Sequence, residues 1–269
     1  MASNPGSAPV DVLALRAGAR EPRRDEVVVE EPLEIRLDGA PLAVTMRTPG
    51  HDVELAAGFL VTEGIARDFG AVSSIAHCDS EQNTVDARTE PGSPGIVRPE
   101  PRAFVASSAC GLCGKATLET LRTRTAPLHA DTTQVDASRL LSLPETLRAV
   151  QPLFHSTGAL HAAALFGVDG TLLCAREDVG RHNAVDKVVG WAALEGKLPL
   201  AGTLLMISGR AGFEIAQKAL VAGIPILAAI SGSSSLAVEL ARENGLTLAG
   251  FVRGESLTVY AGAQRIKFP

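Results

Sequence analysis

The chain of 269 residues is 46% hydrophobic and 20% charged, which is the composition of a globular protein with one large or two ordinary domains. Its formal net charge of −5 argues against nucleic acid or an anionic membrane surface as a partner, because both attract basic proteins. Aromatic residues make up only 4% of the chain, so alanine and aliphatic side chains must build the core.

The sequence shows no pattern of an export or membrane signal. The first residues are small and polar, without the basic region and apolar run of a signal peptide. The longest apolar run, residues 219–230, is shorter than the roughly 20 residues that a bilayer requires. We therefore expect a cytoplasmic protein, in which a Cys-x-x-Cys pair more often binds metal or reacts than forms a structural disulfide.

The N-terminal half predicts a β-rich α+β domain. Residues 1–20 carry proline and glycine without a periodic apolar face, so we expect a disordered tail there. The domain itself is expected over residues 21–128, with Asp38-Gly39 as the turn of a β-hairpin. Strands are expected over residues 26–31, 33–37, 42–46, 72–76 and 85–88, and a helix that opens within residues 49–54 and ends near residue 65.

The pattern changes in the second half, where strands and helices alternate. This alternation predicts an α/β domain over residues 129–269 with a largely parallel sheet. Strands are expected over residues 160–168, 172–175, 203–207, 225–230 and 246–252, and helices over residues 139–151, 183–194, 212–222 and 235–243.

A cysteine pair, Cys110 and Cys113, lies in the last part of the first domain. Gly111 and Gly114 adjoin the two cysteines and permit unusual backbone conformations and the close approach of a partner. Helix-favouring residues begin at Lys115. The partial positive charge of a helix N-terminus and the lysine ammonium both favour thiolate over thiol. The stretch is therefore predicted to be a loop that carries out sulfur chemistry.

Three chemistries fit this pair. A structural zinc site needs four ligands, and here Cys78, Cys174 or a scattered histidine would have to supply two of them. A thioredoxin-like dithiol normally follows the first strand of a compact fold, whereas this pair follows a loop rich in proline and glycine. A persulfide carrier needs one accessible nucleophilic cysteine on a movable loop. Zinc-dependent deamination is not expected, because its His-x-Glu signature would require an acidic residue two positions after His161, and alanine stands there. Cys78, Cys174 and His161 are otherwise expected in the core.

Three loops at the expected carboxyl ends of strands combine glycine with hydroxyl or basic residues. In a parallel α/β sheet ligands bind at this edge, where helix N-termini present free N–H groups to anions. We therefore expect phosphate or pyrophosphate to bind here, although glycine and serine are also ordinary turn residues. The candidate residues are Ser208, Gly209 and Arg210 in the first loop, Ser231 and Ser234 in the second, and Arg253, Gly254, Glu255 and Ser256 in the third.

Residues 177–187 form a further polar segment directly before an apolar helical stretch. We predict that Arg181 and His182 hold phosphate and that Asp178 or Asp186 binds a guanine or ribose edge. The alternative is a capped helix start with surface ion pairs, each of which contributes only ~0–1 kcal/mol.

Together these segments resemble the formate dehydrogenase accessory sulfurtransferases, the FdhD family, in order from about residue 22 to residue 265. The resemblance rests on the cysteine loop and on residues 158–163, 177–187, 208–218, 231–241 and 246–260. It implies a homodimer, a C-terminal domain of cytidine-deaminase-like fold, and a cysteine desulfurase as sulfur donor. The implied acceptor is a bis-molybdopterin guanine dinucleotide cofactor of molybdenum or tungsten, bound as a substrate before insertion into formate dehydrogenase, with no permanent metal in the protein.

The resemblance also assigns roles by position. Cys110 bears the persulfide and Cys113 assists. The family's cofactor-binding segment corresponds to Phe251, Val252, Arg253, Gly254, Glu255 and Ser256. A rival hypothesis from another class is a non-catalytic carrier of the molybdenum cofactor, in which the cysteine pair only closes a loop or binds metal.

The sequence departs from the family pattern at two places. Glu255-Ser256 stands where the family often has Gly-Arg, so an acid replaces glycine and a basic side chain is lost. We expect Arg253 and Arg210 to compensate. Ser234 stands where the family usually has threonine, and the hydroxyl is retained.

Overall fold

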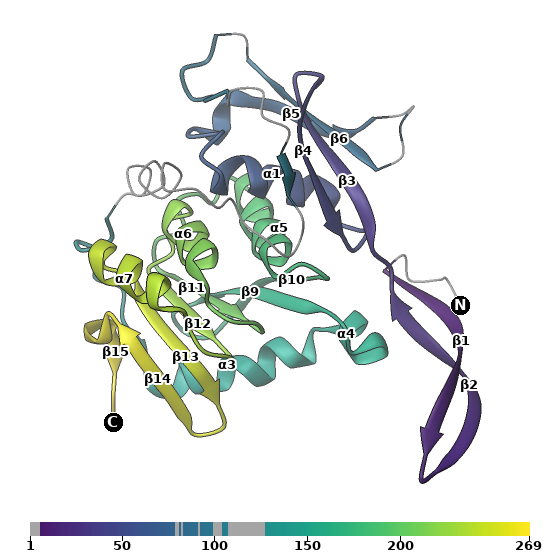
Figure 1. The fold of residues 1–269 in the computed structure, drawn as a ribbon. Coiled ribbons are helices and arrows are strands. Elements are labelled where there is room, and N and C mark those ends of the chain that lie inside the picture. The colour runs from purple at the N-terminus through teal and green to yellow at the C-terminus, as the bar shows by residue number, and fades with distance from the viewer. Residues whose placement is uncertain (1–5, 79–80, 82, 91, 99–103, 107–126) are drawn as a thin grey trace.

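The computed structural model describes residues 6–78, 81, 83–90, 92–98, 104–106 and 127–269 (Figure 1). Within these residues the protein is a mixed α/β fold with a five-stranded sheet in the N-terminal half and a six-stranded sheet in the C-terminal half. The predicted cysteine loop, with Cys110 and Cys113, lies outside the described residues.

The N-terminal sheet has the strand order β5-β6-β3-β4-β7. Its β3–β4 hairpin turns at Asp38 and Gly39, with φ of 53° and 81°, which are values of a type I′ turn and confirm the predicted hairpin. Helix α1 packs its buried leucines against this sheet. The elements are β3 (Glu31–Leu37), β4 (Ala40–Arg47), α1 (Asp52–Thr62), a 3₁₀ turn η1 (Phe69–Ala71), β5 (Val72–His77), β6 (Thr84–Thr89) and β7 (Phe104–Ala106).

A separate antiparallel hairpin, β1 (Ser7–Arg16) and β2 (Ala19–Val28), extends away from the body of the molecule (Figure 1). Ala17 and Gly18 form its two-residue turn. The disordered tail expected over residues 1–20 is therefore wrong from Ser7 onward. The expectation failed because most side chains of the hairpin are exposed, so no apolar face marks β1, and its order comes from the backbone ladder with β2.

The C-terminal sheet has the strand order β10-β9-β11-β12-β13-β14. Only the β11–β12 and β12–β13 pairings are parallel, and β9 and β14 run opposite to their neighbours. The sheet is therefore mixed, and the expected parallel arrangement holds for its central strands. The elements are β8 (Val135–Asp136), α3 (Ala137–Ala149), α4 (Pro152–Thr157), β9 (His161–Gly167), β10 (Leu172–Asp178), α5 (Arg181–Leu194), β11 (Thr203–Ile207), α6 (Phe213–Val221), β12 (Ile226–Ala229), α7 (Ser235–Asn244), β13 (Thr247–Arg253), β14 (Ser256–Ala261), a 3₁₀ turn η2 (Ala263–Arg265) and β15 (Ile266–Lys267).

Helices cover both faces of this sheet (Figure 1). Apolar residues of α5, α6 and α7 pack on one face, and Leu140, Leu143 and Leu147 of α3 pack on the other. The sheet between these layers is built largely from alanine, leucine and isoleucine, as the low aromatic content predicts. Within the described residues, no helix combines the length and apolar character needed to cross a membrane.

Helices α1 and α5 join the two halves at a pair of glycines. A Cβ atom on Gly58 would lie 1.8 Å from the carbonyl oxygen of Asp186, and one on Gly190 would lie 1.7 Å from that of Glu54. The two helices therefore touch backbone to backbone, which only glycine permits. Beside this crossing, Lys218 Nζ of α6 contacts Asp186 Oδ1 of α5 at 2.9 Å, so α6 also packs at this joint between the two halves.

Candidate functional site

The three predicted loops lie together at the carboxyl ends of β11, β12 and β13. Ala211 forms an isolated parallel bridge with Ser233, and its backbone N–H donates to Gly232 O at 3.1 Å. Phe251 N–H donates to Ser231 O at 3.1 Å, which brings the end of β13, just before the third loop, alongside the second loop. The prediction that these loops share one edge of the sheet is confirmed.

Two helix N-termini open from this edge. Gly212 precedes α6, and Ser234 caps α7 by accepting a hydrogen bond from Ala237 N–H at its Oγ. Because the first N–H groups of a helix lack intrahelical partners, they favour bound anions. Arg210 is exposed in the loop before α6. The edge therefore has the chemistry of an anion-binding site.

Phe251, in β13 just before the third loop, has an unusual backbone conformation. It has a φ of 51°, in the left-handed region that a bulky side chain rarely adopts, and its side chain is 41% exposed. Its ring lies so close to Gly232 that a Cβ there would be 2.9 Å from Cζ. The Arg253 guanidinium lies 5.7 Å from the ring centroid. Strained backbone at an exposed aromatic ring is typical of functional sites, and this ring is available for stacking.

The rest of the segment over residues 251–256 divides by exposure. Arg253, Gly254, Glu255 and Ser256 are exposed and form the β13–β14 turn. Val252 is fully buried and packs in the core on the α3 side of the sheet. The prediction that Val252 contacts a ligand is therefore wrong, because strand alternation points this side chain away from solvent.

A cluster of basic and imidazole groups faces the first loop. A Cβ on Gly209 would lie 3.3 Å from His161 Nδ1 and 3.8 Å from Arg181 Cδ, so glycine allows the loop to lie close to both. Burial lowers the pKa of His161, and the charges of Arg181 and His182 lower it further. His182 Nε2 lies 2.8 Å from Glu214 Oε2, and this contact holds the pKa of Glu214 below its usual range. The structure thus places Arg181 and His182 at the predicted edge.

Neither predicted carboxylate faces this edge. Asp178 is fully buried, contacts Lys187 Nζ at 2.7 Å and accepts hydrogen bonds from Thr48 N–H and Asn183 Nδ2. Asp186 is buried against Lys218 in the joint between the two halves. The prediction that Asp178 or Asp186 binds a guanine or ribose edge is therefore wrong, because the protein's own donors occupy their oxygens.

The chain enters the cysteine segment beside this site. In the parallel pairing of β4 and β7, Ala106 lies opposite Thr45, and the chain passes from Ala106 into residues 107–126, outside the described residues. Thr45 Oγ1 donates to Asn183 Oδ1 at 3.2 Å, and Asn183 Nδ2 donates to Met46 O at 2.8 Å. Ala106, the last described residue before the cysteine segment, is thereby held close to the first turn of α5. The roles of Cys110 and Cys113 stay predictions.

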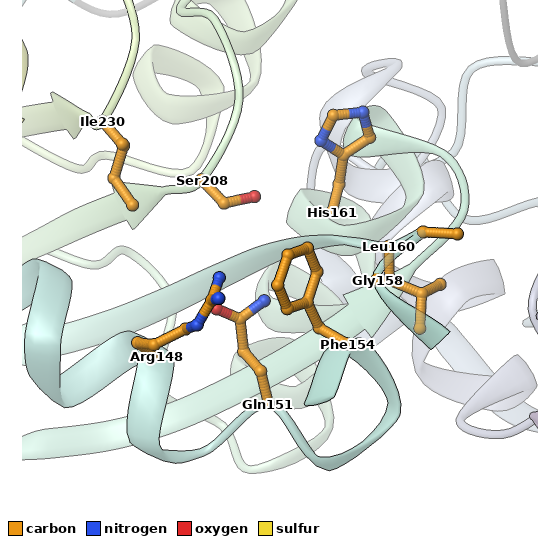
Figure 2. Close-up of a pocket in the computed structure, with 9 residues that line it drawn as sticks. Arg148, Gln151, Phe154, Gly158, Leu160, His161, Ser208 and Ile230 are labelled. Atoms are coloured by element: carbon orange, nitrogen blue, oxygen red, sulfur yellow. The ribbon is translucent and has the colours of Figure 1, made fainter. Parts of the chain in front are cut away.

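A cavity of about 380 Å³ opens at the same edge, on the α3 side of the sheet (Figure 2). Its polar lining residues include Arg148, Gln151, His161 and Ser208. Sequence reasoning identified only Ser208 among these and placed His161 in the core. Arg148 lies in the last turn of α3 and Gln151 directly precedes α4, and neither lies in a motif with a recognisable spacing.

The two cysteines in the described residues have no site around them. Cys174 is buried, as predicted, and burial raises the pKa of its thiol to about 12, which makes it unreactive. Cys78 is partly exposed rather than a core residue, because it follows the edge strand β5. Among the residues that the structure describes, no group of three or more His, Cys, Asp or Glu side chains is arranged to hold a metal ion.

Comparisons with known proteins agree along nearly the whole chain. A model of the FdhD/NarQ family matches residues 28–267. The chain is 54% identical over 267 residues to the sulfur carrier protein FdhD of Streptomyces avermitilis, covering 95% of this chain and 94% of the relative. It is 52% identical over 264 residues to the protein of the same name from Mycolicibacterium paratuberculosis, covering 95% and 97%. The crystal structure of a protein from Desulfotalea psychrophila, named as a formate dehydrogenase accessory protein, matches with a TM-score of 0.80 at 26% identity, covering 98% of this chain and 100% of that one.

Proposed function

Because the chain belongs to the FdhD/NarQ family, we propose that it is a sulfurtransferase that serves formate dehydrogenase. Cys110 receives sulfur as a persulfide from a cysteine desulfurase. The sulfur then passes to the metal of a bis-molybdopterin guanine dinucleotide cofactor, which is a bound substrate carrying molybdenum or tungsten. The protein acts as a cytoplasmic homodimer and releases the sulfurated cofactor to formate dehydrogenase.

The position of β7 supports this function most directly. It leads the chain into the cysteine segment at the edge where Arg181 and the first turn of α5 adjoin the Gly209 loop. Ala106, the last described residue before that segment, thus lies on the side of the molecule that carries loops suited to phosphate groups. The exposed ring of Phe251 adds a surface on which a heteroaromatic ring of the cofactor can stack.

Loading is a thiol–persulfide exchange that needs no oxidant. The thiolate of Cys110 attacks the outer sulfur of the donor's cysteine persulfide, a new S–S bond forms on Cys110, and the donor cysteine leaves as a thiolate. The sulfur keeps its oxidation state throughout. Lys115 and the expected helix start that follows the pair favour the attacking thiolate.

Delivery requires two electrons, because persulfide sulfur lies two electrons above sulfide. Cys113 supplies them when its thiolate attacks the inner sulfur of the Cys110 persulfide. Hydrosulfide leaves, and a Cys110–Cys113 disulfide forms. The acceptor takes the sulfur at the oxidation level of sulfide, and a cellular dithiol reduces the disulfide before the next cycle.

The rival function is a non-catalytic carrier that shields the cofactor. The same loops would bind the cofactor in that case, so nucleotide binding alone does not separate the two functions. Stoichiometric zinc that disappears in a Cys110→Ser variant would favour the carrier. Formate dehydrogenase activity in cells that lack their own copy of the protein is the functional test. Wild type is expected to restore it, whereas a Cys110→Ser variant that restores it equally would contradict the proposed transfer.

The placement of the cofactor is tested separately by nucleotide binding. We expect Arg181→Ala and Arg210→Ala each to weaken guanosine diphosphate binding about 5-fold or more, as the loss of a charged hydrogen bond predicts. Arg139→Ala, at an exposed site on α3, is the matched control. Unchanged affinity in both loop variants would show that the anion site lies elsewhere.

A further inference from the structure

The cavity beside the candidate site is lined by both polar and apolar side chains (Figure 2). Arg148, Gln151, His161 and Ser208 contribute polar atoms, and Phe154 and Ile230 contribute apolar surface. The residues that line it in the described part of the chain include no carboxylate. The cavity thus combines hydrogen-bond donors with an aromatic wall.

Gln151 is the decisive residue. Its side chain is 3% exposed, and its amide nitrogen Nε2 is buried without a hydrogen-bond partner among the residues that the structure describes. A buried donor without a partner is costly, and proteins keep such groups mainly where a ligand or water satisfies them. The amide lies in the wall of the cavity, next to the Phe154 ring (Figure 2). A ligand that enters the cavity therefore meets a donor ready to bind a carbonyl oxygen.

The neighbouring groups define the ligand further. Ser208 Oγ already accepts a hydrogen bond from Ala162 N–H at 2.9 Å, so its hydroxyl hydrogen is free to donate. The Arg148 guanidinium lies over the Phe154 ring, 4.2 Å from its centroid, as a second donor held at the aromatic wall. Hydrogen-bond donors beside an aromatic ring fit a flat ring with acceptor atoms on its edge.

We infer that this cavity binds a planar heteroaromatic ring with a carbonyl oxygen on its edge, which Gln151 Nε2 recognises. Guanine and pterin both belong to this class of ring. The inference rests on the proposed function and deepens it, because the proposed cofactor carries both rings. The cavity connects to the anion loops through Ser208, and through His161, which adjoins Gly209. A phosphate at those loops and a ring in the cavity are thus parts of one extended ligand.

The test compares three probes by equilibrium binding: guanosine diphosphate, free pterin and inorganic diphosphate. Gln151→Leu removes the donor at nearly constant volume, and Gln264→Leu makes the same chemical change at an exposed residue of η2. We expect Gln151→Leu to weaken at least one ring-bearing probe about 10-fold, with diphosphate affinity unchanged and the melting temperature equal or higher. Gln264→Leu is expected to change none of these values.

The comparison of the ring-bearing probes identifies the ring. A loss confined to guanosine diphosphate assigns the cavity to guanine, and a loss confined to pterin assigns it to the pterin. The inference is overturned if both ring-bearing probes bind Gln151→Leu as well as wild type, if neither binds wild type, or if diphosphate loses affinity equally. Persulfide formation on Cys110 of the wild-type protein is measured independently, so an empty cavity and a failure of sulfur transfer are distinguishable.

Discussion

Ala106, the last residue of β7, lies opposite Thr45 of β4. The Thr45 hydroxyl in turn donates a hydrogen bond to Asn183 Oδ1 at 3.2 Å. Thr45 thus links Ala106, from which the chain enters the cysteine segment, to the first turn of α5, which begins at Arg181. The contact therefore joins the last described strand before the cysteine segment to the other half of the chain.

Removal of the Thr45 hydroxyl is expected to weaken this connection. Thr45→Val leaves the buried Asn183 Oδ1 without that donor, which is expected to lower the free energy of unfolding by about 1–2 kcal/mol. Sulfur delivery is expected to slow while persulfide loading on Cys110 is unchanged, because loading does not require the α5 edge. Thr45→Ser keeps the hydroxyl and is expected to restore delivery. Equal delivery rates in Thr45→Val and wild type would show that the contact serves stability alone.

The glycine crossing of α1 and α5 is expected to tolerate no side chain. Gly58→Ala places a methyl group 1.8 Å from a backbone oxygen, so the helices must separate, and we expect a loss of about 3 kcal/mol or more in the free energy of unfolding. Gly212→Ala is the control, since its Cβ meets no atom of the described residues within 4 Å and its φ is −82°. Denaturant unfolding should show a loss below about 1 kcal/mol for the control. Similar losses in the two variants would contradict the close crossing.

Glu54 predicts an acid-sensitive contribution to stability. Burial alone would raise the pKa of its carboxyl, but hydrogen bonds from Arg176 and His51 lower it to about 2. Because the folded-state pKa lies below the ordinary value of 4.5, the contribution is complete above pH 4.5 and is lost as the pH falls through about 2. Glu54→Gln is expected to remove on the order of 2–3 kcal/mol of this pH dependence. A stability difference between variant and wild type that stays constant from pH 6 to pH 2 would contradict it.

Turn chemistry and the periodicity of apolar residues predicted the parts of the fold that depend on neighbouring residues in the sequence. The Asp38-Gly39 turn was predictable because a type I′ turn selects these residues. The alternation of strands and helices in the second half predicted the order of the longer elements from α3 to β13, but it missed β8, α4, β14 and β15. The β1–β2 hairpin was not predictable from an apolar face, since its side chains are largely exposed. The antiparallel pairing of β9 with β10 and β11, and of β14 with β13, depends on contacts across the sheet, which sequence periodicity does not encode.

The candidate site shows the same division. The Gly209 and Gly232 loops follow strands, so their meeting at one edge follows from the topology. The sequence does not distinguish a buried Asp178 from an exposed one, and only the positions of Lys187 and Thr48 reveal that it is structural. No sequence signal marked Gln151, because its distinguishing feature is a buried amide nitrogen without a hydrogen-bond partner in the described part of the chain.

The measurement that tests the central claim most directly is the mass of each cysteine-containing peptide after incubation with a cysteine desulfurase and cysteine. We predict one added sulfur, about 32 Da, on Cys110 of wild type, and a Cys113→Ser variant that retains this sulfur but fails to release it. Cys174 serves as the internal control and is expected to stay unmodified, since its thiol has a pKa of about 12. A Cys110→Ser protein that gains the same sulfur adduct as wild type would contradict the assignment of Cys110 as the carrier.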